Sequence, residues 1–461
     1  MKSFIDDDII QTLLEKAKGA SNSEVRKIIK SALRLKGLTP EQTAVLLQTD
    51  QKDNLQAIFR AARQIKEEIY GKRLVLFAPL YVTNECVNNC LYCAFRRDNK
   101  SLERKTLNLA EIKREVQAIE AEGHKRILLV AGEDPGSANI KMLEKIIETI
   151  YKTRRGRGEI RRLNVNVAPL SLANFKKLKK TGIGTYQLFQ ETYHRSTYSM
   201  VHPRGPKSNY LYRLFAMDRA MAAGIEDVGI GALFGLYDYK FEVLALLYHA
   251  LHLEKAFAVG PHTISVPRIE PAVGAVISHM PPYPVSDLDF KKLVAILRLA
   301  VPYTGLILST RENAKMRNEL VGLGISQISA GSRTNPGGYV EQRNDNAAQF
   351  SLSDERSTSE VILDVMQLGY IPSFCTACYR VGRTGEKFMD LAKPGEIHAF
   401  CQPNALLTLK EYLLDYSKDG EKAIGEKVIS EELKRIVDPK IRQTTRAKLK
   451  EVESGKRDLY F

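Results

Sequence analysis

The sequence predicts an α/β protein built around a closed (βα)8 barrel, with a helical N-terminal extension and a small C-terminal domain. Short apolar runs alternate with longer amphipathic segments through the middle of the chain. This alternation favours a parallel sheet covered by helices. Eight strand–helix repeats over about 260 residues suit a closed barrel. The chain has 461 residues, which leaves room for extensions on both sides of the barrel.

We expect the strands at eight apolar runs: Leu74–Val82, Arg126–Ala131, Leu163–Ala168, Thr185–Gln190, Asp227–Ala232, Thr263–Pro267, Gly305–Ser309 and Ser326–Gly331. The helices expected between them are Leu109–Glu122, Lys141–Lys152, Leu172–Lys180, Lys207–Ala223, Tyr239–Phe257, Asp287–Val301 and Arg311–Val321. An open, doubly wound sheet is the alternative, but no Gly-x-Gly-x-x-Gly turn follows the first strand. In a barrel of this kind, function gathers in the loops after the strands.

The sequence divides into three regions. Residues 1–72 are expected to be helical, because Leu and Ile recur at spacings of three and four and Thr39-Pro40-Glu41-Gln42 is typical of a helix start. We assign residues 73–340 to the barrel, because the alternation stops after Gly337-Gly338. Residues 341–461 contain a polar loop, a helix near Ser357–Leu368 and a charged helical tail, which predicts a separate C-terminal domain.

Composition narrows the function classes. Hydrophobic residues make up 44% of the chain, but no apolar run approaches the length of a membrane span. The N-terminus lacks the layout of a signal peptide, so we expect a cytoplasmic protein. The formal charge is +15, with basic surpluses at 152–162 and 434–457 that contain no Trp. A solvated basic face is favoured over nucleic-acid binding; attraction of an anionic ligand or an acidic protein partner is the other interpretation.

The first cysteine group is the strongest signal in the chain. Cys86, Cys90 and Cys93 follow the first expected strand with the spacing Cys-x3-Cys-x2-Cys. Thiolates are the ligands of iron–sulfur clusters, and three can hold a cubane while leaving one iron open for chemistry. A zinc site would commonly need four ligands in two close pairs, and inert buried cysteines are the other alternative.

The second cysteine group consists of Cys375, Cys378 and Cys401, and the two groups use all six cysteines. Disulfides are not expected in the cytoplasm. Three further thiolates allow a second cubane with a free iron. The alternative is a zinc site completed by His398, whereas a catalytic Cys–His pair would not need three cysteines.

The first group, with the aromatic Tyr92 before its last cysteine, resembles the radical S-adenosylmethionine (SAM) superfamily. The resemblance implies a TIM-type radical SAM barrel and a [4Fe-4S] cluster whose open iron binds SAM, which is cleaved to a 5′-deoxyadenosyl radical. It also implies SAM contacts from Gly132 and Glu133, although Ala131 stands where the family pattern has Gly. Glu191 would bind the ribose or amine, Arg213 the carboxylate, and Gly229 and Gly231 the adenine. A packing role for Gly231 and a surface role for Arg213 remain alternatives.

The two groups together, with YQLFQETYH, GIGALFGLYDY, GPHTISVPRIEPA and ISAGSRTNPGGY, resemble the tyrosine-cleaving radical SAM maturases of [FeFe] hydrogenase over nearly the whole chain. The resemblance implies cleavage of L-tyrosine to p-cresol and dehydroglycine. Dehydroglycine would give carbon monoxide and cyanide at a second [4Fe-4S] cluster with an additional iron, forming an Fe–CO–CN precursor of the H-cluster. One alternative is a tyrosine lyase of thiamine-thiazole synthesis, which would make only dehydroglycine. Another is a zinc-containing nucleic-acid-binding module.

This interpretation places further residues. Arg268 and Arg311 follow the sixth and seventh strands and are expected to bind the tyrosine carboxylate, with Ser309 and Ser329 adding hydrogen bonds; a salt-bridged structural Arg is the alternative for each. The second cluster is expected to close the opposite end of the barrel. A histidine would bind the extra iron, with His252 favoured over His262 and a hydrogen-bonded core histidine as the alternative. The implied partners are a flavodoxin or ferredoxin as electron donor and other hydrogenase maturation proteins, with no nucleic acid and no membrane.

Overall fold

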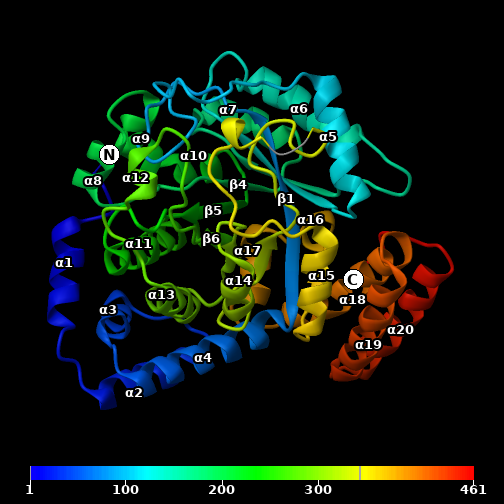
Figure 1. Ribbon diagram of the computed structural model, residues 1–461. Coiled ribbons are helices and arrows are strands. Elements are labelled where there is room, and N and C mark those ends of the chain that lie inside the picture. The colour runs from blue at the N-terminus through cyan, green and yellow to red at the C-terminus, as the bar shows by residue number, and fades with distance from the viewer. Residues whose placement is uncertain (1, 342–343) are drawn as a thin grey trace.

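The computed structural model describes residues 2–341 and 344–461, and its centre is a closed barrel of parallel strands (Figure 1). The barrel strands are β1 (Arg73–Thr83), β2 (Arg126–Ala131), β3 (Arg162–Asn166), β4 (Thr185–Gln187), β5 (Asp227–Gly231), β6 (Thr263–Ser265), β7 (Gly305–Leu308) and β8 (Gln327–Ser329). They pair in chain order, and β1 pairs with both β8 and β2, which closes the ring. The predicted barrel is confirmed, and each expected strand overlaps an observed one.

Helices cover the outside of the barrel. The outer helices are α5 (Leu109–Ala121), α6 (Ile140–Lys152), α7 (Leu172–Lys180), α10 (Ala216–Ala222), α11 (Tyr239–Phe257), α13 (Asp287–Ala300) and α14 (Ala314–Val321). The segment expected as one helix at 207–223 is divided into α9 (Tyr210–Leu214) and α10, because Phe215 leaves the helical conformation with a ψ of 19°. Two short helices were not predicted: α8 (Arg195–Val201) and α12 (Val276–His279), in the loops after β4 and β6.

The N-terminal extension is helical and lies against one side of the barrel. It consists of α1 (Asp7–Lys16), α2 (Asn22–Ala32), α3 (Pro40–Gln48) and α4 (Lys52–Tyr70). Thr39 begins α3 with a capping box, as the sequence predicts. Helices α3 and α4 pack on α11 and α13, and α4 then leads directly into β1 (Figure 1).

A ninth strand, β9 (Ile371–Ser373), joins the barrel sheet from the C-terminal part of the chain. It pairs in parallel with the first residues of β1, Arg73 with Ile371 and Val75 with Ser373, whereas β2 pairs with β1 only from Ala78 onward. Helix α15 (Thr358–Gln367) leads into β9. The start of β1 therefore lies beside a strand that is followed at once by Cys375.

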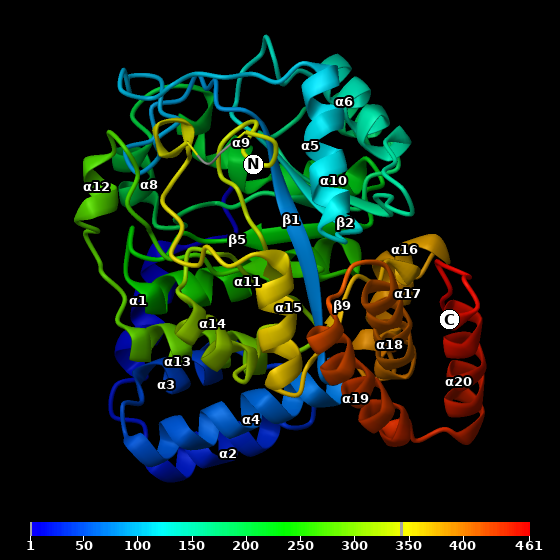
Figure 2. The same ribbon diagram turned by 45° about the vertical axis from the view of Figure 1, so that its right-hand side comes forward.

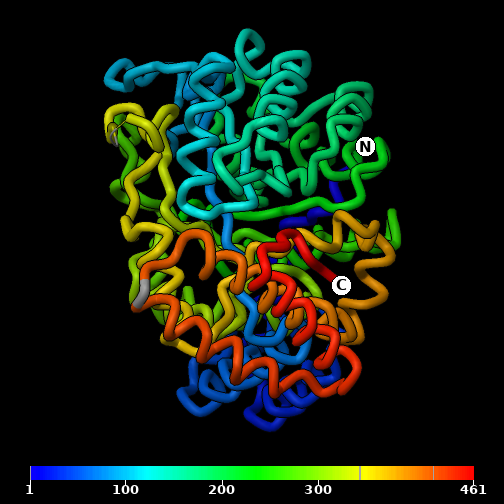
Figure 3. The backbone as a smooth tube through the Cα atoms, turned by 90° about the vertical axis from the view of Figure 1, so that its right-hand side faces the viewer, coloured from blue at the N-terminus to red at the C-terminus, as the bar shows by residue number. Residues whose placement is uncertain are grey.

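The remaining helices pack beside the N-terminal end of the barrel (Figures 2 and 3). They are α16 (Ala377–Arg380), α17 (Gly385–Ala392), α18 (His398–Asp415), α19 (Asp419–Arg435) and α20 (Pro439–Glu453). Arg161 pairs with Glu411 at 2.9 Å, and Arg157 pairs with Asp415 at 3.4 Å. Lys152, Arg154, Arg155 and Arg157 are exposed, as expected of a solvated basic face, whereas the Arg161 side chain is only 4% exposed and is held by its ion pair with Glu411.

The chain after residue 344 crosses the mouth of the barrel before it reaches α15. The amide of Glu103 donates to the carbonyl of Asn346 at 2.9 Å, and Phe350 lies under the Arg311 guanidinium. Asp354 anchors this mouth segment through an ion pair with Arg317, and both side chains are only 1% exposed. Arg317 also donates to the carbonyl of Ser329 at the end of β8.

None of the helices in the described parts of the chain combines the length and apolarity required to cross a membrane.

We expect Asp354→Ala to lower the free energy of unfolding by about 3 kcal/mol, because it leaves the buried Arg317 guanidinium without its counter-charge. Denaturant unfolding of the purified protein measures this. The control is Glu341→Ala, which removes a partner of Lys105 that is 59% exposed and should cost less than about 1 kcal/mol. Equal losses for the two variants would contradict the anchoring role of Asp354.

Candidate active site and metal centres

The first cysteine group forms a loop that begins just after β1. Cys86, Cys90 and Cys93 are all free thiols, and Cys90 is only 5% exposed. The amide of Cys93 donates to the carbonyl of Cys90 at 3.2 Å, which tightens the loop. The side-chain amides of Asn88 and Gln349 lie 3.8 Å from the sulfurs of Cys86 and Cys93, respectively.

The electrostatic surroundings of these thiols are suited to binding a metal cluster. Burial raises the pKa of Cys90 to about 11 and that of Cys93 to about 12, so without a bound cation both stay protonated. Iron would supply the positive charge that holds them as thiolates. Within residues 2–341 and 344–461, no three His, Cys, Asp or Glu side chains converge as ligands of a single ion. A cubane does not require its thiolates to converge on one ion, because the three thiolates bind three different irons.

The end of β2 is bonded to the cysteine loop. A Cβ at Gly132 would lie 2.1 Å from the carbonyl oxygen of Glu85, so only glycine fits there. The amide of Val87 donates to the carbonyl of Glu133 at 2.8 Å, and the Asn88 amide group donates to the Glu133 carboxylate at 2.6 Å. The residues expected to bind the SAM amine are therefore held directly beside the cysteines.

Glu191 occupies a strained position after β4. Its φ of +72° is uncommon outside glycine, and its carbonyl accepts from the amide of Leu233 at 2.7 Å. Its carboxylate binds Lys207 at 2.7 Å and Arg213 at 3.4 Å. Burial would raise the pKa of Glu191, but the two cations outweigh burial and lower it. Glu191 is therefore an ionised carboxylate, 12% exposed, close to the cysteine loop.

The other residues expected to contact SAM lie close to this carboxylate or to the strand ends. Arg213 is 7% exposed and also donates to the carbonyl of Phe189, so the surface alternative is wrong. The Tyr92 hydroxyl bonds to Nε2 of His202 at 2.8 Å. Gly231 has the Phe189 ring where a Cβ would lie, at 2.8 Å, and Gly229 has Thr263 there at 2.3 Å. Close packing alone therefore requires glycine at both positions.

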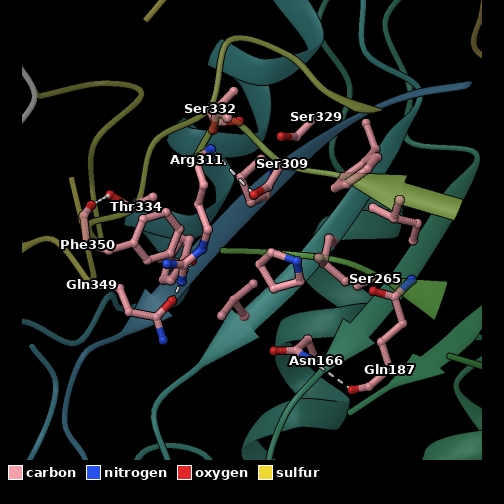
Figure 4. Close-up of a pocket in the computed structure, with 18 of the residues that line it drawn as sticks. Asn166, Gln187, Ser265, Ser309, Arg311, Ser329, Ser332, Thr334, Gln349 and Phe350 are labelled. Atoms are coloured by element: carbon pink, nitrogen blue, oxygen red, sulfur yellow. Dashed lines mark hydrogen bonds between the residues drawn. The ribbon is translucent and has the colours of Figure 1, made fainter. Parts of the chain in front are cut away.

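A cavity of about 700 Å³, part of it open to solvent, lies inside the barrel beneath the mouth segment; we call it the barrel cavity (Figure 4). Its apolar walls include Phe77, Leu128, Val130, Ile307 and Phe350. Its polar lining is Asn166, Gln187, Ser265, Ser309, Thr310, Arg311, Ser329, Ser332, Thr334 and Gln349. The single cation and the hydroxyls could bind the carboxylate and amine of an amino acid, and the apolar walls could hold an aromatic side chain.

Arg311 and Arg268 differ in what they can bind. Arg311 lines the barrel cavity, as do Ser309 and Ser329, and among the described residues the hydroxyls of Ser329 and Ser332 have no hydrogen-bond partner. Arg268 instead binds Glu312 through two nitrogens and Asp287 at 2.8 Å. The expectation that Arg268 binds the substrate carboxylate is corrected to the salt-bridged alternative, because its guanidinium is already occupied outside this cavity.

The second cysteine group lies at the opposite end of the barrel. Cys375 follows β9, Cys378 lies in α16, and Cys401 lies in α18 with 5% exposure. Burial and then the neighbouring Cys401 and Cys375 raise the pKa of Cys378 to about 12. The three cysteines line a second cavity, the cysteine cavity, together with Tyr70, Arg73, Val75, Arg126, His262, Gly305, Gln327 and Tyr379.

Two arginines make this cavity suitable for an anionic cluster. Burial would lower the pKa of Arg73, but Cys401 and Cys375 outweigh burial and raise it, and Nε of Arg73 has no hydrogen-bond partner in the part of the chain that the structure describes. Arg126 donates to the carbonyl of Cys375 at 3.2 Å. Buried positive charge of this kind offsets the negative charge that thiolate ligands bring.

The three histidines considered as ligands lie in different surroundings. Nε2 of His262 bonds to the Tyr379 hydroxyl at 2.9 Å within the cysteine cavity, and Nδ1 lies 3.5 Å from Asp227. His252 bonds to Asp218 at 2.7 Å and stacks on Phe4 outside both cavities. The position of His252 does not support the preference for it, because, of these two histidines, only His262 lines the cysteine cavity. The ring of His398 faces Gly71, and His398 does not line the cysteine cavity.

The two cavities are stacked along the barrel axis. Val75, Gly305 and Gln327 line the cysteine cavity, and the residues two positions further along the same strands, Phe77, Ile307 and Ser329, line the barrel cavity. Side chains two positions apart on a strand share one face and lie about 7 Å apart. Adjacent layers of inward-facing residues therefore separate the two sites.

Several site residues were missed from the sequence. Lys207 was included only in a predicted helix, yet it binds Glu191. Ser265, Asn166 and Gln187 lie at the ends of strands, where their polarity inside apolar runs was the available signal. Gln349 and Phe350 gave no signal, because they reach the cavity from the mouth segment.

Two family models match the chain. Residues 80–247 match the radical SAM superfamily, and residues 265–371 match the biotin and thiamin synthesis associated domain. The 2-iminoacetate synthase of Salmonella typhimurium is 33% identical over 76% of this chain and 90% of its own length. That of Escherichia coli is 30% identical over 79% of this chain and 94% of its own length.

Two solved structures are similar over nearly the whole chain. A crystal structure of HydG, a maturase of the [FeFe]-hydrogenase, superposes with a TM-score of 0.97 at 55% identity and covers 100% of both chains. The HydG maturase from Carboxydothermus hydrogenoformans superposes with a TM-score of 0.84 at 43% identity, covering 96% of this chain and 98% of its own.

We expect Arg311→Met to raise the KM for L-tyrosine about 10-fold to 100-fold, because a charge-assisted hydrogen bond to the carboxylate contributes about 1.5–3 kcal/mol. Initial rates of p-cresol formation measure this. In the control Arg268→Met, the lost charge lies outside the barrel cavity, so KM should stay within about twofold. An unchanged KM for Arg311→Met would rule out its role as the carboxylate ligand.

Proposed function

The chain belongs to the HydG family of [FeFe]-hydrogenase maturases, which are radical SAM enzymes, and from this we propose that the two ends of its barrel carry out consecutive reactions. L-Tyrosine is cleaved to p-cresol and dehydroglycine at the first cysteine group. Dehydroglycine is converted to carbon monoxide and cyanide at the second, which yields an Fe–CO–CN precursor of the H-cluster. The observation that carries this proposal is the stacking of two cavities in one barrel, one beside each group of three thiols.

At the first site, Cys86, Cys90 and Cys93 would hold a [4Fe-4S] cluster. With SAM bound, that cluster supplies a 5′-deoxyadenosyl radical. The chain's own residues orient SAM: Glu133 and Glu191 offer carboxylates to its amine and ribose. Lys207 and Arg213 keep Glu191 ionised, and Arg213 has further guanidinium nitrogens for the SAM carboxylate.

The barrel cavity positions L-tyrosine. Arg311 would bind its carboxylate, with Ser309, Ser329 and Ser332 as hydrogen-bond partners. The apolar walls would hold the ring, and the mouth segment with Gln349 and Phe350 would exclude water. Proximity and orientation then decide which hydrogen atom is removed, because an unselective radical reacts with its nearest neighbour.

Polar side chains lie where the two cavities approach each other. Gln187 lines the barrel cavity, Gln327 lines the cysteine cavity, and Gln187 bonds to Thr263 on β6 at 3.4 Å. A small, polar molecule such as dehydroglycine can make hydrogen bonds in this layer. Transfer inside the barrel would protect this imine from water.

At the second site, Cys375, Cys378 and Cys401 would hold another [4Fe-4S] cluster. With an additional iron, that cluster supplies the place where carbon monoxide and cyanide are retained. His262 would offer Nε2 to the iron, and Asp227 would orient the imidazole through Nδ1, as carboxylates commonly do for histidine ligands. The Tyr379 hydroxyl would then give up its bond to Nε2.

The alternatives are less well supported. A thiazole-type tyrosine lyase would resemble the 2-iminoacetate synthases, but these match only 76% and 79% of this chain. A HydG structure covers 100% of this chain, including the region that carries the second cysteine group. A zinc-containing nucleic-acid-binding module does not agree with the radical SAM match at residues 80–247.

The proposed function implies partners and a place in the cell. An electron donor of the flavodoxin or ferredoxin type would supply the electron for SAM cleavage. Other hydrogenase maturation proteins would receive the Fe–CO–CN product. Both requirements suit the cytoplasm, where reducing conditions keep the six cysteines free.

Anaerobic reconstitution with SAM, L-tyrosine and dithionite tests the proposal. The wild type should form p-cresol, carbon monoxide and cyanide. The double variant Cys375→Ala, Cys378→Ala should still form p-cresol but little carbon monoxide, because only the second site has lost its ligands. The matched variant Cys86→Ala, Cys90→Ala should form none of the three products. Normal carbon monoxide from the first double variant would refute the division between the sites.

The iron ligand has its own test, because each candidate histidine lies beside an aspartate, His262 beside Asp227 and His252 beside Asp218. His262→Ala should bind about one iron fewer per chain after reconstitution and desalting, and Asp227→Asn should weaken binding of that iron about 10-fold to 100-fold. The controls His252→Ala and Asp218→Asn alter the pair outside both cavities and should retain wild-type iron. Loss of iron from the His252 variant alone would reverse the assignment. Iron content and electron paramagnetic resonance spectra measure the outcome.

A further inference from the structure

Two chain segments form the outer wall of the first cysteine loop. The amide of Leu91 donates to the carbonyl of Val201 at 3.0 Å, and the amide of Asn89 donates to the carbonyl of Arg204 at 3.1 Å. On the other side, Nε of Arg96 donates to the carbonyl of Gly274 at 3.0 Å. The side chains of Val201 and Ile277 pack in the same apolar cluster as Cys90 and Tyr92. Residues 200–207 and 273–280 are therefore the layer directly outside the loop; we call them the wall segments.

Large apolar side chains are exposed on this wall. Met200 is 53% exposed, Val276 is 79% exposed and Met280 is 78% exposed. Met200 and Val276 lie on α8 and α12, which are neighbours in both views (Figures 1 and 2). Single exposed apolar residues are common, but three on neighbouring segments indicate a contact surface.

Unpaired positive charge lies beside this apolar patch. Arg97 and Lys100 follow the cysteine loop, Arg204 lies on the wall, and all three are exposed. In the described parts of the chain, none of the three side chains has a hydrogen-bond or ion-pair partner. The nearby Asp98 accepts a hydrogen bond from Asn89 at 2.8 Å.

The basic stretches singled out in the sequence differ from this surface. Arg157 and Arg161 lie near the other end of the barrel and form ion pairs with the C-terminal helices. Arg457 in the tail is bound to Asp415 at 2.6 Å. Ion pairs within the chain neutralise these three arginines, whereas Lys440 and Arg446 on α20 are exposed.

We propose that the wall segments, with Arg97 and Lys100, dock an acidic one-electron carrier protein that reduces the first site. The proposal rests on the proposed function, because SAM cleavage consumes one electron. The carrier loses that electron and SAM gains it, with cleavage of the S–C5′ bond to methionine and the 5′-deoxyadenosyl radical. Electron transfer slows steeply with distance, so a carrier must approach where the covering layer is thin.

The composition of the surface suits such a partner. Unpaired cations beside a small apolar patch raise the association rate with an acidic protein and keep the complex short-lived. Electron-transfer complexes typically bury small interfaces, which three apolar side chains and a cationic rim can provide. Release after each electron is needed for repeated turnover.

The test compares two reductants on charge-reversal variants. In Arg97→Glu, Arg204→Glu, p-cresol formation driven by subsaturating reduced flavodoxin should fall at least about tenfold, whereas the dithionite-driven rate stays within about twofold. The Kd for oxidised flavodoxin, measured by calorimetry at low salt, should rise about tenfold. The matched control Lys440→Glu, Arg446→Glu makes the same charge change on α20, where both residues are exposed, and should change neither reading.

A second variant, Val276→Ser, Met280→Ser, keeps the charge and should also weaken flavodoxin binding without affecting the dithionite-driven rate. An unchanged Kd and flavodoxin-driven rate in the Arg97, Arg204 variant would overturn the proposal. Equal losses in the α20 control, or an equal loss with dithionite, would also overturn it. If the wild type forms no p-cresol with dithionite, the proposed function fails, and the Kd comparison still decides the docking site.

Discussion

Strand β1 forms parallel hydrogen bonds with three other strands, and this pairing fixes the positions of the two cysteine groups relative to each other. Its last residues pair with β2 and lead into the first cysteine loop, and its first residues pair with β9, which leads into Cys375. Pairing with β8 on the other edge closes the barrel. Because side chains on these strands alternate, the same register that joins the sheet aligns the inward-facing residues from one cavity to the next. The separation between the two sites is thus set by backbone geometry rather than by loops.

Charge balance in a buried interior is the second constraint. Burial raises the pKa of Cys90, Cys93, Cys375 and Cys378, so each thiol needs positive charge nearby to ionise. Around Glu191 the balance is reached by Lys207 and Arg213, and around the second group by Arg73 and Arg126. Lys207, Arg213 and Arg126 bond to groups of the sites themselves, whereas Arg97 and Arg204 outside the first loop have no hydrogen-bond or ion-pair partner within the described residues. Cations that neutralise buried groups of a site therefore differ from exposed cations that can bind a partner protein.

The barrel could be predicted because strands and helices differ in length and apolar period, and several boundaries agree, such as Arg126–Ala131 for β2 and Tyr239–Phe257 for α11. Strand β9 could not, since three residues including Pro372 carry no periodic signal. The choice between His252 and His262 depended on which residues face each ring. Phe4 covers one and Tyr379 contacts the other, and both contacts come from distant parts of the chain. Arg268 and Arg311 follow strands equally well, but only tertiary structure shows that Glu312 binds Arg268.

The pairing of β1 with β9 has a consequence for biosynthesis. Strands β1 to β8 are complete once the ribosome has added Ser329, so the barrel and the first thiol loop can form while the chain is still growing. The partner of Arg73 to Val75 is residues 371–373, and the last thiol of the second group is Cys401. Until those residues emerge, the first part of β1 keeps an open edge that a chaperone or a neighbouring chain can bind. The second group of three thiols is therefore the later of the two to be completed during translation.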